Sequence, residues 1–298
     1  MTTPQTEMSH ASAPGFDTRA DSEALAILAA AQVEAARAVQ GAASEIAAAA
    51  RLAAASLAAG GRLIYAAAGS SGLMALADAS ELPGTFGIAG ERIVVLLAGG
   101  LASLPALPGG PEDDAEAARA AIAASNVGPH DCIIALTASG HTPYPLAAAA
   151  AGRAAGARTI GIANNAGAAL FGQVDIAICL ATPPEVIAGS TRMGAGTAQK
   201  IALNMLSTMV AVHLGHVHDG FMVNLVADNA KLRERARRIV MSVAGLPAEQ
   251  AAQWLERADG SVKLAIMLAA GADDVPGARH LLATHDNRLR PALEALGR

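Results

Sequence analysis

Residues 63–72 read LIYAAAGSSG, and this stretch decides the fold. A short apolar run enters a turn of glycine and serine, and a helix-like segment follows near residues 73–80. The run does not alternate between polar and apolar residues as a half-exposed strand does. It is therefore typical of a parallel strand that is covered on both faces. The stretch predicts a strand that leads through a tight turn directly into a helix.

Four further apolar runs of this kind follow along the chain. They span residues 93–97, 132–136, 159–162 and 176–180, with helix-like segments near 115–125 and 145–154. Short strands that alternate with helices predict an α/β fold, a doubly wound parallel sheet flanked by helices. Ligands of such sheets bind outside the carboxyl ends of the strands, so the turns there are the places to search for a site.

The rest of the chain suggests three parts. Residues 1–17 are rich in Ser, Thr, Pro and Ala, which indicates a flexible tail, and a long helical region runs from about Asp21 to Gly60. The main domain is predicted to span 18–243, with two long helical segments after Ser190. Residues 244–298 contain short helix-like segments separated by turns, which indicate a small helical C-terminal subdomain.

Composition excludes several classes of protein. The chain has 298 residues, 53% of them hydrophobic, a net charge of −5 and a pI near 5.9. This charge disfavours a nucleic-acid partner, which needs a basic face. No apolar stretch is long enough to span a membrane, and no signal peptide is recognisable, so we expect a cytoplasmic protein. Cys132 and Cys179 lie in apolar runs and are expected to be small core residues.

Two hydroxyl-rich turns suggest an anion site. The first strand ends in Ser70, Ser71 and Gly72, and the third is followed by residues 137–143, which include Ser139, Gly140 and Thr142. Free N–H groups at a helix start favour anions, and hydroxyls add donors without bulk. One such turn alone is an ordinary helix cap, but two in one sheet favour a shared phosphate site. Neither turn matches a dinucleotide or nucleoside-triphosphate motif.

Two carboxylates stand near these turns in the predicted fold. Glu81 ends the helix after the first turn, and Glu112 follows the second strand on the same edge of the sheet. Such a pair suits general acid–base catalysis, although each residue alone is more simply explained as a residue at a helix terminus. His213, His216 and His218 have too loose a spacing for a metal site and are interpreted as surface residues.

Several strings together resemble the N-acetylmuramic acid 6-phosphate etherase family, over nearly the whole chain from about residue 16. They are GRLIY at 61–65, GSSG at 69–72, DASE at 78–81, TFG at 85–87, ASG at 138–140, TPY at 142–144, PEVIAGSTRM at 184–193, AGTAQK at 195–200 and NMLST at 204–208. The same sugar-isomerase-type fold occurs in the glucokinase regulatory protein.

The resemblance implies cleavage of the lactyl ether at C3 of N-acetylmuramic acid 6-phosphate, giving N-acetylglucosamine 6-phosphate and D-lactate in peptidoglycan recycling. It assigns Glu81 as the base at C2 and Glu112 as the acid that protonates lactate and activates water. It implies no metal and no organic cofactor, a homodimer, and a C-terminal helical lid. It places phosphate and substrate binding on a set of loop residues: Ser70, Ser71, Gly72, Ser139, Gly140, Thr142, Glu185 and Ser190.

The chain also departs from the family pattern. Leu73, His141 and Gly194 stand where the family usually has Arg, Arg and Lys, and Ala230 replaces a glutamate. Charge-assisted contacts contribute roughly 1.5–3 kcal/mol each, so these losses leave two alternatives open. One is a paralogous isomerase or lyase that acts on another sugar phosphate. The other is a regulator that senses a sugar phosphate without converting it.

Overall fold

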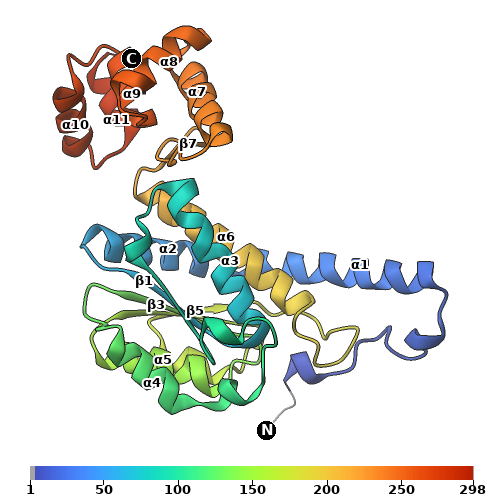
Figure 1. The fold of residues 1–298 in the computed structure, drawn as a ribbon. Coiled ribbons are helices and arrows are strands. Elements are labelled where there is room, and N and C mark those ends of the chain that lie inside the picture. Colours follow the sequence, from blue (N-terminus) through green and yellow to red (C-terminus); the bar gives the residue numbers. More distant parts are fainter. Residues whose placement is uncertain (1–3, 298) are drawn as a thin grey trace. The chain divides into compact units, whose positions relative to one another are not determined.

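The computed structural model describes residues 4–297 of the chain. They divide into two compact units (Figure 1). The first unit comprises Met1–Ala79 and Glu91–Ser207, and the second comprises Ser80–Gly90 and Thr208–Arg298. The second unit thus includes a short segment from the first half of the chain as well as its C-terminal part.

A five-stranded, fully parallel sheet forms the centre of the first unit. Its strands are β1 (Leu63–Ala67), β2 (Ile93–Leu97), β3 (Cys132–Thr137), β4 (Arg158–Ala163) and β5 (Ile176–Cys179), in the order β2-β1-β3-β4-β5. Every residue of β1 and β3 is buried, which explains why both strands read as unbroken apolar runs. The predicted α/β fold is confirmed, and each predicted strand end lies within one residue of the observed one.

Helices cover both faces of this sheet (Figure 1). On one face lie α4 (Ala115–Ala124) and α5 (Pro143–Ala154), and on the other lie α2 (Ala43–Ala58), α3 (Gly69–Phe86) and α6 (Gly194–His213). The alanine-rich sequence of α2 supplies small side chains that bring the helix close to the strands, and Ala49, Ala50 and Ala53 are fully buried. The strand order places the ends of β1 and β3 side by side, with α3 and α5 starting directly beyond them.

A buried aspartate ties the first strand to two helices. Asp78 of α3 accepts hydrogen bonds from Tyr65 Oη at 3.0 Å, Asn204 Nδ2 at 2.8 Å and Ser207 Oγ at 2.9 Å. Tyr65 and Ser207 are buried as well, so these donors are shielded from water. The network fixes the direction of α3 as it leaves the turn after β1.

Removing this carboxylate should destabilise the protein strongly. Asp78→Ala would leave three donors without an acceptor, and we expect the free energy of unfolding to fall by about 3 kcal/mol in urea titration. Tyr65→Phe removes only one donor and leaves two partners on the carboxylate, so about 1 kcal/mol is expected. Equal losses for the two variants would contradict the central role of Asp78.

The N-terminal residues hold defined positions in the described part of the chain. The short 3-10 helices Gln5–Glu7 and Phe16–Thr18 precede α1 (Asp21–Ala38), which the 3-10 helix Val39–Ala42 joins to α2. Helix α1 runs away from the sheet (Figure 1). Of the residues predicted as a tail, 1–3 lie outside the described residues, whereas Thr6 is buried.

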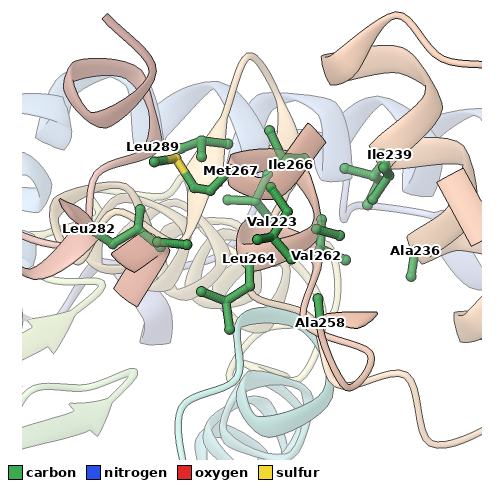
Figure 2. Packing of buried hydrophobic residues seen from close by; sticks show 14 of the residues in the cluster. Val223, Ala236, Ile239, Ala258, Val262, Leu264, Ile266, Met267, Leu282 and Leu289 are labelled. Carbon is green, nitrogen blue, oxygen red and sulfur yellow. The ribbon is translucent and has the colours of Figure 1, made fainter. Parts of the chain in front are cut away.

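The second unit is mostly helical. It contains α7 (Ala230–Ala244), α8 (Ala248–Arg257), α9 (Val262–Ala269), α10 (Val275–Thr284) and α11 (Leu289–Ala295). Its core is centred on α9, whose residues 262–268 are all buried, and it includes Val223, Ile239, Leu282 and Leu289 (Figure 2). The structure thus confirms a helical C-terminal region. Among residues 4–297, no helix has the combined length and apolar character that a membrane crossing requires.

The two long helical segments expected after Ser190 are α6 and α7, and the segment between them contains two strands that were not predicted. They form a small antiparallel hairpin of β6 (Val217–His218) and β7 (Phe221–Met222). The turn at Asp219 and Gly220 has positive φ at both residues, which suits a tight hairpin turn. The three histidines predicted to lie on the surface are instead partly buried around this hairpin: His213, His216 and His218.

Candidate functional site

A polar cavity of about 180 Å³ lies at the carboxyl ends of β1 and β3. Backbone and side chains from five separate segments form its wall. They are Glu7, residues 68–71 after β1, Glu112, residues 136–139 and 142 at the end of β3 and in the turn that follows it, and finally Gly189 and Thr191. The sequence predicted a ligand site at this edge of the sheet, and the cavity lies there. Of the predicted site residues, five share its wall: Ser70, Ser71, Glu112, Ser139 and Thr142.

The first turn presents the start of α3 to the cavity. Helix α3 begins at Gly69, and the first N–H groups of a helix have no partner within it. Gly69 has φ +53°, and a Cβ atom there would come within 2.6 Å of Glu112 Oε1. Glycine is therefore required on two grounds, the left-handed backbone and the close approach of the Glu112 carboxyl. The turn brings a helix start and a carboxyl group together in one cavity.

The second turn contributes a cluster of hydroxyl groups. Thr137 Oγ1 lies 2.8 Å from Thr142 Oγ1 and 3.3 Å from Ser139 Oγ, and the latter two are 3.3 Å apart. Free N–H groups were expected at the start of α5, but two of its first three residues, Pro143 and Pro145, have none. Hydrogen bonding on this side of the cavity therefore depends mainly on the hydroxyl groups.

Glu112 brings a carboxyl group with a shifted pKa to this wall. It lies in the 3-10 helix Gly110–Asp113 and is half-buried. Burial, and secondly the negative charge of Asp113, raises the pKa of Glu112 above its ordinary value. A raised pKa keeps this carboxyl protonated to a higher pH than an ordinary glutamate, which suits Glu112 to donate a proton.

Glu7 also lines the cavity, and the sequence analysis missed it. The N–H of Thr6 donates to Asn165 Oδ1 at 3.3 Å, and Asn165 Nδ2 donates to Thr6 Oγ1 at 3.1 Å. Asn165 Nδ2 also donates to the carbonyl oxygens of Ala138 and Ser139. The segment with Glu7 is thus tied to the second turn. It falls in the stretch assigned to a flexible tail, where composition gives no signal for such a contact.

Glu185 does not line the cavity; its carboxylate instead caps the start of helix α6. Its carboxylate accepts hydrogen bonds from the N–H groups of Gly194 at 2.9 Å and Ala195 at 2.8 Å, at the start of α6. A carboxylate at a helix N-terminus stabilises the unpaired N–H groups there. Its predicted role in substrate binding stays a prediction.

Three other predicted binding residues shape the backbone near the cavity. Gly72 donates its N–H to Ala68 O within the first turn of α3. Gly140 has φ +82°, and a Cβ atom there would lie 2.2 Å from Ala168 Cβ, so only glycine fits. Ser190 lies between the wall residues Gly189 and Thr191, and its N–H donates to Ile187 O.

Glu81 is an exposed residue of α3 and lies one turn beyond Asp78. It belongs to the segment Ser80–Gly90, which groups with the second unit. The helix continues past it to Phe86, although Pro83 follows two residues later. Its role as the base at C2 stays a prediction.

The three residues that depart from the family pattern differ in their exposure to solvent. Leu73 is exposed on α3, and His141 is exposed beside the second turn, where its Nδ1 lies 3.0 Å from Ser139 O. Gly194 is buried against Glu185 and Ala35. None of these three residues lines the cavity, so none brings a cationic side chain to its wall.

Comparison with known proteins gives a consistent answer. A family profile described as SIS domain matches residues 28–164. The chain is 45% identical to the N-acetylmuramic acid 6-phosphate etherase of Deinococcus radiodurans over 301 aligned residues, which cover 100% of this chain and 99% of the relative. It is 41% identical to the enzyme of the same name from Geobacillus thermodenitrificans, over 74% of this chain and 75% of the relative.

A solved structure supports the fold assignment. A phosphoheptose isomerase from Neisseria gonorrhoeae matches 64% of this chain and 98% of its own chain, with a TM-score of 0.51 and 15% sequence identity. At this identity the likeness concerns the fold alone. It agrees with the parallel sheet and flanking helices of the first unit.

Proposed function

The chain belongs to the N-acetylmuramic acid 6-phosphate etherase family, and we infer that it cleaves the lactyl ether of this sugar phosphate at its strand-end cavity. It is a carbon–oxygen lyase. The observation that carries the assignment is the 45% identity to an etherase over the whole chain, and the cavity lined by hydroxyl groups supports it. Two alternatives left open by the sequence, another substrate or a sensor, have no comparable support.

We propose that the phosphate of the substrate lies between the two turns. Ser70 and Ser71 at the start of α3 and the cluster of Thr137, Ser139 and Thr142 would donate hydrogen bonds to its oxygens. Such a site binds a dianion without a lysine or arginine side chain, because oriented N–H and O–H dipoles replace the cation. Binding by dipoles explains how the chain tolerates Leu73 and His141.

The reaction then needs one base and one acid. In the open-chain sugar the C1 aldehyde acidifies the C2 proton, which the Glu81 carboxylate removes. The electron pair left at C2 forms the C2–C3 double bond as the C3–O bond breaks, and Glu112 gives its proton to the departing lactate oxygen. Water, deprotonated by Glu112, then adds at C3, and the protonated Glu81 carboxyl returns a proton to C2. Each group ends in its starting state, so no net proton or electron is consumed.

The direct test of this function is the release of D-lactate from N-acetylmuramic acid 6-phosphate by the purified chain. We expect stoichiometric release of D-lactate and N-acetylglucosamine 6-phosphate, detected by a lactate-dehydrogenase assay and by mass spectrometry. N-Acetylmuramic acid without the phosphate is the matched control and should react far more slowly. Thermal stabilisation by sugar phosphates without any lactate release would contradict the function.

Glu7 should contribute to binding the sugar. A carboxylate on the wall repels phosphate but accepts hydrogen bonds from sugar hydroxyl groups. Glu7→Gln should therefore weaken N-acetylglucosamine 6-phosphate binding about tenfold in calorimetry and leave inorganic phosphate binding unchanged or tighter. Asp17→Asn, which removes one exposed charge from the same part of the chain, should change neither affinity. Equal weakening of both ligands by Glu7→Gln would argue against this role.

The proposal extends to a cytoplasmic homodimer that acts in peptidoglycan recycling. In α1 only Ala35 is buried, while Leu25 and Val33 are 64% and 50% exposed. Apolar residues left uncovered on a long helix are typical of a surface that another chain covers. Light scattering should give twice the chain mass of 29.7 kDa, and Leu25→Glu with Val33→Glu should reduce it to the monomer. A monomeric wild-type chain would refute the dimer.

A further inference from the structure

The second unit contains a polar cavity of its own, separate from the one described above. Its volume is about 350 Å³, and it lies where α9 and α10 meet the segments on either side of the β6–β7 hairpin. Six polar residues contribute to its lining: His216, Asn224, Ser261, Lys263, Arg279 and Asn287. Two of them carry a positive charge, and no Asp or Glu stands among the described residues that line the cavity.

Lys263 is the central feature of this cavity. It lies in the first turn of α9, and only 6% of its surface is exposed. Its ammonium donates one hydrogen bond, to the carbonyl oxygen of Asn287 at 2.9 Å, although an ammonium has three donors. Burial lowers the pKa of Lys263 to about 8, and no carboxylate offsets this effect. A buried charge without a counterion is costly. An anion bound next to the Lys263 ammonium would therefore stabilise it.

The neighbours of Lys263 suit a ligand that carries hydroxyl groups as well as charge. The Nδ1 atom of His216 has no hydrogen-bond partner among residues 4–297. Burial first, and the charge of Lys263 second, lowers the pKa of His216 to about 4, so its imidazole is neutral at pH 7. Asn224 donates to Phe86 O through Nδ2, which leaves its amide oxygen to accept. Arg279, exposed on α10, adds a second cation at the wall.

We propose that this cavity is a second ligand site, which binds the phosphate group of a small phosphorylated metabolite between Lys263 and Arg279. The phosphate supplies the counterion that Lys263 lacks, and the remaining polar groups contact the hydroxylated part of the ligand. Because all these residues belong to the second unit, the site is complete without the strand-end cavity. The inference does not depend on the etherase reaction.

Phosphate binding at Lys263 can be followed directly by NMR, because the chain contains only three lysines and their signals can be told apart: Lys200, Lys231 and Lys263. With ¹³C at lysine Cε, the full-length protein gives three signals, and Lys263→Met assigns the buried one. Lys200 and Lys231 are exposed and serve as internal controls. The probes are inorganic phosphate and N-acetylglucosamine 6-phosphate, with N-acetylglucosamine as the uncharged control and D-lactate as the carboxylate control.

Saturating phosphate should raise the titration midpoint of Lys263 and leave the other two lysines unchanged, because a bound anion favours the protonated amine. Arg279→Gln should increase the phosphate concentration at half-maximal response about tenfold. Arg238→Gln, at an exposed arginine of α7 outside this cavity, should not change it. Ser139→Ala, in the strand-end cavity, should also leave the Lys263 response intact.

Three results would overturn the proposal. The first is a Lys263 midpoint that does not move at any phosphate concentration. The second is an equal response to N-acetylglucosamine, which would show that charge is not recognised. The third is loss of the Lys263 response in Ser139→Ala, which would assign the response to the other cavity. A stronger response to D-lactate than to phosphate would likewise overturn the assignment to phosphate.

Discussion

Glu81→Gln should lower kcat for D-lactate release from N-acetylmuramic acid 6-phosphate by about 10²–10⁴-fold. A glutamine side chain keeps the size of glutamate but cannot accept the C2 proton, and loss of a general base typically has an effect of this size. Because Glu81 is exposed, the substitution should leave the fold intact. Glu91→Gln, at an exposed glutamate of the 3-10 helix Gly90–Arg92, is the matched control and should keep full activity.

Solvent isotope exchange separates this role from simple binding. In D₂O the wild-type chain should place deuterium at C2 of N-acetylglucosamine 6-phosphate, and Glu81→Gln should not. Calorimetry should show that the variant still binds the product with near wild-type affinity. A variant that releases lactate within a few-fold of the wild-type rate would exclude Glu81 as the base.

Glu112→Gln should cause a loss of similar size, about 10²–10⁴-fold in kcat, for a different reason. Glutamine cannot supply the proton that the departing lactate oxygen needs. If Glu81 remains functional, proton removal at C2 continues, so deuterium should enter C2 faster than lactate is released. Full lactate release by Glu112→Gln would show that another group acts as the acid.

The pH dependence of the wild-type enzyme should report the raised pKa of Glu112. Glu112 must be protonated to act as an acid, so kcat/KM should fall as the pH rises through its pKa. The negative charge of Asp113 contributes to raising this pKa. Asp113→Asn should therefore lower it and move the falling limb of the profile to lower pH. An unchanged limb in Asp113→Asn would assign the titration to another group.

The sheet was predictable because each of its strands is a short, nearly unbroken apolar run. The central strands β1 and β3 are buried along their whole length, and the edge strands β2 and β5 are partly buried but still apolar, so all five runs predicted their strands to within one residue. The helix after β1 was harder to delimit. Its first residues read as a glycine-serine turn and its last turn contains Pro83, but the structure includes both in α3. The two strands of the hairpin contain two residues each, which is too short for a recognisable alternation of polar and apolar residues in the sequence.

The cavity was predictable only where its residues follow strands directly. The serines and threonines of the two turns were found in this way, because the carboxyl ends of neighbouring parallel strands meet at one edge. The contact between Glu112 and Gly69 depends on a left-handed backbone at the glycine, which composition does not reveal. Glu7 is held at the cavity by the hydrogen bonds between its neighbour Thr6 and Asn165, and no local pattern predicts a partner so distant in the chain.

The hydrogen bonds between Thr6 and Asn165 have a consequence for the order of folding. The two residues are 159 positions apart, so the N-terminal segment leaves the ribosome long before its partner is made. Contacts of such separation carry a large loop-closure entropy and form late. The segment that is synthesised first should therefore dock last. Nascent chains should gain a protected sheet before the cavity has its final wall, and ligand binding should appear only after that last step.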